Sequence, residues 1–212
     1  MREYFDSELN ELNEELLKMV SYADRMLSLA SSLIGKENDV MEEVKSLYEK
    51  IDGKERLIEA SCMKLLLLRQ PVASDLRQIS SILKIINDLQ RIGDQAENIA
   101  EMLSIANKTC VSENKPVSEM ALVTKEMLDD SIKSFIEKDK ALAKEVIKTD
   151  DLVDEKFMSV KNDLIDIIHN DKNDGEFIID ILMCAKYYEK IGDHCVNIAK
   201  QAIYYMTGKQ AS

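Results

Sequence analysis

Apolar residues recur every three or four positions along most of the chain. Phe5, Leu9, Leu12 and Leu16 begin one such series, which continues to Ile34. This spacing places the apolar side chains on one face of an α-helix, where they can pack against other helices. Similar series follow, and together they predict six helices, over residues 3–34, 38–69, 71–106, 117–137, 139–169 and 176–207.

Turn signals divide these helices into two sets of three. Gly35 follows the first helix, and Pro71 ends the second, because the residue before a proline is pushed out of the helical region. Residues 107–116 form the most polar connector, and residues 170–175 form a clear turn. The pattern predicts an all-α fold of two tandem antiparallel three-helix bundles. We place the bundles at residues 1–110 and 115–212.

One ten-residue motif occurs twice. Residues 91–100 and residues 190–199 both read basic-Ile-Gly-Asp-x-x-x-Asn-Ile-Ala, at a constant offset of 99 residues (190 − 91 = 99). A single copy would be ordinary for the solvated face of a helix. Two copies at one offset indicate an internal duplication in which the acidic residue has a shared role.

Side chains four residues apart lie in one row along a helix. In the second half this row holds Glu189, Asp193 and Asn197, and the preceding helix carries Asp150 and Asp154. Counting outward from a turn near Lys172 predicts that Asp150 faces Asp193 and that Asp154 faces Glu189. Four carboxylates at two adjacent levels repel one another unless cations neutralise them. Oxygen ligands of this kind suit hard cations such as Mg²⁺, Mn²⁺, Fe or Ca²⁺, and we expect the bound metal to be Fe, Mn, Mg or Zn.

The first half repeats this geometry with fewer charges. Counting from Pro71 places Tyr48 opposite Asp94 and Asp52 opposite Gln90. A tyrosine and a glutamine therefore stand where the second half has carboxylates. We predict a weaker or empty cation site in this half, built from Asp52, Glu55, Gln90, Asp94 and Asn98.

Composition narrows the class of protein. The 212 residues carry a formal net charge of −12, which argues against nucleic acid as a partner, because such binding depends on Lys and Arg. Neither a signal peptide nor an apolar run long enough to span a membrane is visible, so we expect a cytoplasmic protein. Neither Ser-His-Asp nor Cys-His sets suitable for nucleophilic catalysis are evident. We predict that the protein is not an enzyme, with a metal-dependent enzyme as the alternative.

Three segments resemble the PhoU family of bacterial phosphate-uptake regulators. They are residues 68–77 (Leu-Arg-Gln-Pro-Val-Ala-Ser-Asp-Leu-Arg), residues 88–94 (Asp-Leu-Gln-Arg-Ile-Gly-Asp) and residues 188–193 (Tyr-Glu-Lys-Ile-Gly-Asp). The resemblance covers nearly the whole chain. It implies two three-helix bundles with metal bound at the acidic motifs. It also points to Pro71, Ala73, Asp75 and Arg77 as candidates for partner binding.

The resemblance also implies a function. The chain would be a regulatory adaptor that restrains the phosphate-starvation response and phosphate uptake. It would couple the ATPase subunit of a phosphate ABC transporter to a membrane sensor histidine kinase, and it would reach the membrane only through these partners. Homodimers are common in the family. An accessory role for a sodium-phosphate carrier is the alternative. Gln90 and Tyr48 depart from the family pattern, which again weakens the first metal site.

Overall fold

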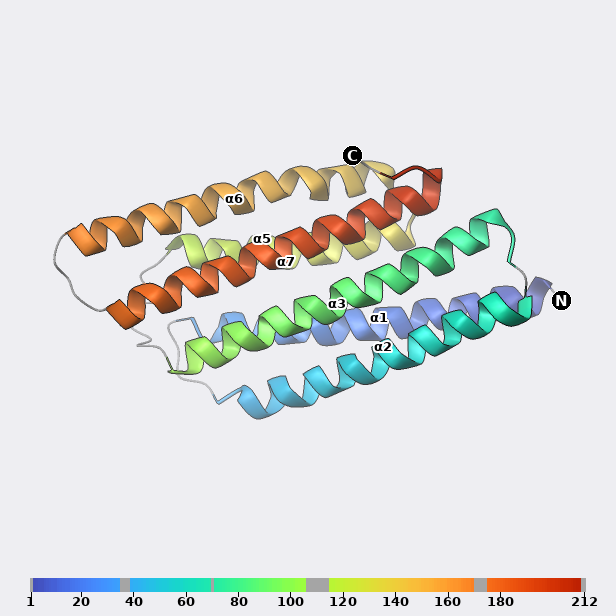
Figure 1. Cartoon of the computed structure of the whole chain (residues 1–212), viewed down its shortest axis with the longest axis horizontal. Helices are drawn as coiled ribbons and strands as arrows, with labels where there is room; N and C mark the ends of the chain where they lie inside the picture. Colours follow the sequence, from blue (N-terminus) through green and yellow to red (C-terminus); the bar gives the residue numbers. More distant parts are fainter. Residues whose placement is uncertain (1, 35–38, 70, 106–114, 170–174, 211–212) are drawn as a thin grey trace.

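The computed structural model describes residues 2–34, 39–69, 71–105, 115–169 and 175–210. Long helices occupy almost all of this part of the chain and run along one common axis (Figure 1). The predicted all-α fold is confirmed, with helix ends close to the predicted ones. Gly35 and most of the two predicted connectors at 107–116 and 170–175 lie outside the described residues. The helices are α1 (Arg2–Ser32), α2 (Met41–Arg69), α3 (Ala73–Ile105), α5 (Lys115–Ile136), α6 (Lys140–His169) and α7 (Gly175–Thr207).

Helices α1 to α3 form the first bundle, and α5 to α7 form the second. The bundles meet mainly through α3 and α7, which lie side by side in the centre of Figure 1, and to a smaller extent through α1 and α5. Helices α3 and α7 run in opposite directions. The Nε of Arg77 donates to the carbonyl oxygen of Tyr205 at 3.1 Å, and the hydroxyl of Ser81 donates to the carbonyl oxygen of Gln201 at 3.3 Å.

The apolar stripes that predicted the helices form the core. Ile79, Ile82 and Ile86 on α3 are fully buried, as is Tyr188 on α7. Each of these isoleucine side chains contributes about 1.5–3 kcal/mol by its removal from water. The Tyr188 hydroxyl reaches to 3.5 Å from the hydroxyl of Ser31 on α1, so it has a polar neighbour across the two bundles. This packing holds the polar rows of α3 and α7, whose side chains lie four residues apart, in a fixed register.

The turn between α5 and α6 fixes where α5 ends and where α6 begins. Lys138 adopts a left-handed conformation with φ 57°, which reverses the chain after α5. The carboxylate of Asp139 then accepts hydrogen bonds from the amides of Ala141 at 2.8 Å and Leu142 at 3.0 Å. This N-cap satisfies amides that have no partner within the helix, and so fixes where α6 starts. Among the described residues, none of the helices is both long and apolar enough to cross a membrane.

Candidate functional site

The carboxylate of Asp150 on α6 lies directly against α7. A Cβ atom on Gly192 would stand 2.9 Å from Asp150 Oδ1, so the glycine makes the close approach possible. Burial raises the pKa of Asp150 to about 6, and the neighbouring charges of Asp193, Asp154 and Glu189 add to this effect. Asp150 is therefore within electrostatic reach of these three acids, while the facing pairs Asp150–Asp193 and Asp154–Glu189 stay a prediction.

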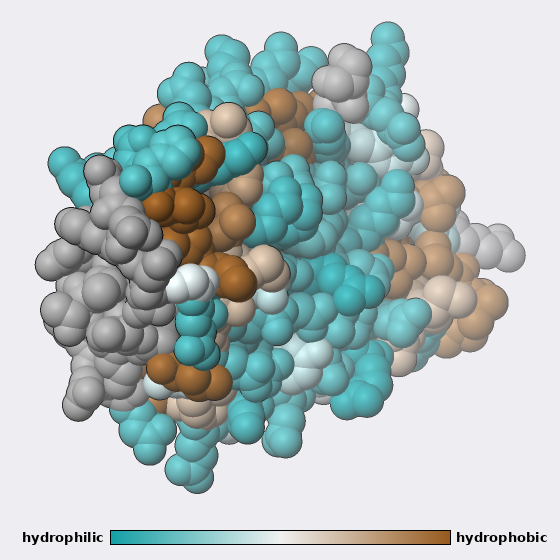
Figure 2. Space-filling view, turned by 60° about the vertical axis from the view of Figure 1, so that its left-hand side comes forward, coloured by the Kyte–Doolittle hydropathy of each residue, from teal (hydrophilic) through white to brown (hydrophobic). Residues whose placement is uncertain are grey.

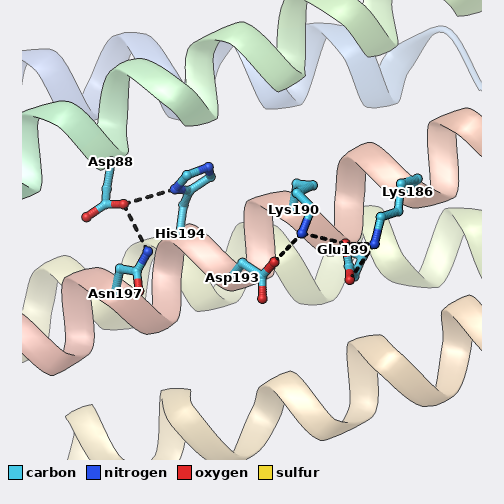
Figure 3. Close-up of polar contacts among 7 residues, drawn as sticks. All are labelled: Asp88, Lys186, Glu189, Lys190, Asp193, His194 and Asn197. Carbon is cyan, nitrogen blue, oxygen red and sulfur yellow. Dashed lines mark hydrogen bonds and ion pairs between the residues drawn. The ribbon is translucent and has the colours of Figure 1, made fainter.

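Two lysines of α7 neutralise part of this charge. Lys190 Nζ lies 2.6 Å from Asp193 Oδ2, and Lys186 Nζ lies 2.7 Å from Glu189 Oε1. Figure 3 shows both lysines reaching along the helix toward these acids. The hydrogen bond to Asp193 raises the pKa of Lys190. A metal cation at this site would therefore compete with Lys190 for Asp193.

The side chain of Asn197 points away from Glu189 and Asp193, the two acids of its row. It donates to Asp88 Oδ1 on α3 at 3.2 Å, and His194 Nδ1 lies 2.9 Å from the same oxygen. Figure 3 shows both side chains directed toward α3. The three residues thus join the two bundles. Asp88 was not among the predicted site residues, because sequence spacing within one helix says nothing about contacts between bundles.

In the first half, both oxygens of Asp94 have partners. The Tyr48 hydroxyl donates to Asp94 Oδ1 at 2.8 Å, and Arg91 Nη1 donates to Oδ2 at 3.0 Å. The hydrogen bond raises the pKa of Tyr48 to about 12. The predicted pairing of Tyr48 with Asp94 is confirmed. Arg91 occupies the basic position of the first motif, as Lys190 does in the second, and each neutralises the Asp three residues later.

Three acids near Asp94 are Asp52, Glu55 and Glu97. Asp52 Oδ1 is buried and has no hydrogen-bond partner. Burial, followed by the charge of Asp52, raises the pKa of Glu55. Burial also raises the pKa of Glu97, with the charge of Glu101 as the next cause. Sequence reasoning missed Glu97, although it stands three residues after Asp94 on one helical face. Both amides of the predicted set, Gln90 and Asn98, are half-buried.

The donor chemistry of these clusters fits a hard cation. Carboxylate oxygens predominate, Asp52 has an unpartnered buried oxygen, and Gly192 leaves space for Asp150. In the described part of the chain, however, His, Cys, Asp and Glu side chains are not gathered in threes around a shared metal position. Lysine and arginine side chains, not a shared metal position, neutralise Asp94, Glu189 and Asp193 in this structure. Metal binding therefore stays a prediction.

The predicted partner segment is divided between exposed and internal positions. Ala73 is exposed and Pro71 is half-buried, whereas Asp75 is buried. Arg77 donates a hydrogen bond to the backbone carbonyl oxygen of Tyr205. The structure therefore leaves Pro71 and Ala73 accessible and gives Arg77 a contact that joins the two bundles.

The two bundles each match one family model. The model, described as the PhoU domain, covers residues 16–103 and 117–202. The chain belongs to the PhoU family. The internal repeat, the paired acidic motifs and the segment from Pro71 to Arg77 are therefore features of a PhoU-family chain.

Full-length relatives are similar to this chain throughout. A Clostridium acetobutylicum protein is 35% identical over 99% of this chain and 97% of its own length. An Aquifex aeolicus protein is 37% identical over 95% of this chain and 92% of its own. Both are named phosphate-specific transport system accessory protein PhoU homologs.

A solved structure extends the likeness to three dimensions. The crystal structure of PhoU from Pseudomonas aeruginosa superposes with a TM-score of 0.87 at 28% identity, over 97% of this chain and 100% of that one. The PhoU structure from Streptococcus pneumoniae shows the same fold, with a TM-score of 0.88 over 98% of this chain and 99% of that one. The chain is thus similar to PhoU proteins over nearly its whole length, in both sequence and fold.

Proposed function

We propose that this chain restrains phosphate uptake and the phosphate-starvation response as an adaptor between two membrane systems. Its partners would be the ATPase subunit of a phosphate ABC transporter and a sensor histidine kinase. The observation that carries the proposal is the end-to-end match to relatives named as accessory proteins of the phosphate-specific transport system. These names describe accessory proteins, which favours an adaptor over an enzyme. The adaptor would work in the cytoplasm, and as a homodimer.

Deletion of the gene tests this proposal directly. We expect the deletion strain to express a starvation-response reporter while phosphate is plentiful, and the wild-type chain to restore repression. A second deletion, of the ABC transporter ATPase, separates the two transport contexts. If the chain still alters phosphate uptake in that background, it serves a sodium-phosphate carrier and the ABC coupling is wrong. Direct binding of the purified chain to the ATPase subunit gives the same distinction in vitro.

We further propose that the cluster between α6 and α7 binds a metal cation. Asp150, Asp154, Glu189 and Asp193 would supply carboxylate oxygens, and the cation would relieve the repulsion that adds to burial in raising the pKa of Asp150. A bound cation would add positive charge to a surface that is otherwise acidic. The α2–α3 cluster would bind more weakly, since Tyr48 and Gln90 stand where the second half has carboxylates and the Tyr48 hydroxyl already donates to Asp94.

Elemental analysis of protein purified without a chelating tag tests the metal site. Bound Fe, Mn, Mg or Zn should disappear in a Glu189→Ala/Asp193→Ala variant. A Glu145→Gln/Asp163→Asn variant removes two exposed acids elsewhere on α6 and should keep the metal. Circular dichroism shows whether the helices persist, because removing repelling carboxylates should not unfold the bundle. Wild-type protein that holds no metal after reloading would exclude this part of the proposal.

A further inference from the structure

A groove between α1 and α2 lies apart from the clusters described above. It encloses about 510 Å³ and combines an apolar floor with charged edges. Leu12 and Leu65 form buried parts of the floor, whereas Leu57 is 47% exposed. The charged edges are formed by Glu8, Glu11, Glu14 and Glu15 of α1 and by Lys54 and Lys64 of α2.

The acids of this groove are only partly neutralised within the chain. Glu15 forms ion pairs with Lys18 and Lys54, and Glu8 lies 3.4 Å from Lys64. Glu11 and Glu14 are exposed and make no hydrogen bond or ion pair in the described part of the chain. The groove therefore presents two unpaired carboxylates beside an exposed leucine.

The internal repeat shows that bundle packing does not require the exposed leucine. Helices α2 and α6 correspond at an offset of 102 residues, because buried residues coincide at Ile51 and Val153 (153 − 51 = 102) and at Ile58 and Val160. At the same offset Leu57 corresponds to Ser159, which is exposed and polar. The second bundle is thus built without an apolar residue at this place, so Leu57 is available for another role.

We infer that the α1–α2 groove binds a basic amphipathic helix of a partner protein. The apolar face of such a helix would cover Leu57 and the floor, as in other complexes where a helix lies in a groove. Its Lys or Arg residues would reach Glu11 and Glu14. A second copy of the chain is a poorer occupant, because it carries the same formal charge of −12. The inference uses different residues from the metal cluster, so it can fail while the proposed function stands.

A designed peptide provides the probe. It is a fluorescent helix of about five turns, with Leu along one face and Lys on the rest. An otherwise identical peptide with Glu in place of Lys is the charge control. Fluorescence anisotropy with the full chain should show binding of the Lys peptide, weakened by added salt. We expect no binding of the Glu peptide.

Matched variants locate the binding surface. Leu57→Ser, and separately Glu11→Gln/Glu14→Gln, should each weaken binding about fivefold or more. Met158→Ser removes a side chain of similar exposure from α6, and Glu145→Gln/Asp163→Asn removes the same charge; neither should alter binding. Hydrogen exchange should slow in α1 and α2 around the groove when the peptide is bound.

Three results would overturn the inference. The first is no binding to the wild-type chain, and the second is equal weakening by the α6 control variants, which would indicate general attraction to an acidic protein. The third concerns the occupant. If sedimentation shows self-association of the wild type that Leu57→Ser abolishes, the groove holds a second copy and the basic-helix assignment is wrong.

Discussion

Gly192 allows the carboxylate of Asp150 to lie against α7, since a Cβ atom at position 192 would stand 2.9 Å from Asp150 Oδ1. Gly192→Ala should therefore push the Asp150 carboxylate, the end of a flexible side chain, away from α7, and this displacement should offset the gain of about 0.5–1 kcal/mol that alanine brings by helix propensity, so that the free energy of unfolding stays close to that of the wild type. Urea denaturation followed by circular dichroism measures this free energy. Metal binding by the cluster should fall.

Two other glycines supply the controls for this substitution. A Cβ atom on Gly93 would lie 3.2 Å from a terminal methyl carbon of Ile51, and on Gly53 it would meet nothing within 4 Å. Gly53→Ala should raise stability by about 0.5–1 kcal/mol through helix propensity. Gly93→Ala should fall between the other two. If Gly192→Ala were as stable as Gly53→Ala, the close approach of Asp150 would have no energetic consequence.

The raised pKa of Asp150 makes metal-free stability depend on pH. Its pKa is about 6 in the folded chain against an ordinary value of 3.8, so the folded state binds the proton more tightly. The free energy of unfolding should therefore fall as pH rises from about 4 to about 6. After allowance for solvent screening of this half-buried group, the contribution is on the order of 1 kcal/mol.

Chelator-treated protein, unfolded in urea across this pH range, measures the effect. Asp150→Asn should flatten the slope relative to the wild type, whereas Asp163→Asn, at an exposed acid further along α6, should not. Saturating Mn²⁺ should also flatten it, because a bound cation keeps the carboxylate ionised. A wild type and an Asp150→Asn variant with parallel pH profiles would show that the site does not hold Asp150 under strain.

The first-half cluster offers a gain of binding. Tyr48→Asp with Gln90→Glu restores the two carboxylates that the second half has at these places, and it frees Asp94 from the Tyr48 hydroxyl. We expect Mn²⁺ to bind this half at least about tenfold more tightly, as charge is added to an oxygen-ligand site. Calorimetric titration in a Glu189→Ala/Asp193→Ala background isolates the first half. Tyr48→Phe with Gln90→Ala is the matched control, and equal affinity in both variants would contradict the carboxylate argument.

Much of this arrangement could be predicted from the chain alone. Helix spacing gave the six helices, and counting outward from a turn placed Tyr48 beside Asp94, because two antiparallel helices joined by a short connection have one register. The motif acids likewise fell in rows because residues four apart share a helical face. These are local rules, and they apply within one hairpin.

Contacts between hairpins could not be predicted in this way. His194 and Asn197 meet Asp88 because α3 packs against α7 at a particular height, and spacing within one helix does not determine that height. The neutralising role of Lys190 follows a local rule and could have been found from its position three residues before Asp193. Whether a metal ion displaces Lys190 from Asp193 depends on the free energy of metal binding, which residue spacing does not give.

Arg77 connects the first bundle to the end of the last helix. Its Nε donates to the carbonyl oxygen of Tyr205 at 3.1 Å, near a helix C-terminus where carbonyls lack partners within the helix and a positive charge is favourable. Arg77→Leu should cost about 1–2 kcal/mol of stability. It should also speed hydrogen exchange at the C-terminal end of α7 more than elsewhere. The stability of Arg77→Lys should lie between those of the wild type and Arg77→Leu, since lysine keeps the positive charge but loses the planar guanidinium donor.

Hydrogen exchange in α7 shows whether Arg77 acts through its contact between the bundles or by binding a partner protein. Arg56→Leu, at an exposed arginine of α2, should leave exchange in α7 unchanged. If Arg77→Leu leaves α7 exchange unchanged but weakens binding to the transporter ATPase, Arg77 acts on the partner and its contact with Tyr205 is incidental. If it speeds α7 exchange and leaves ATPase binding intact, the docking surface suggested by the family resemblance narrows to the accessible Pro71 and Ala73, because Asp75 is buried.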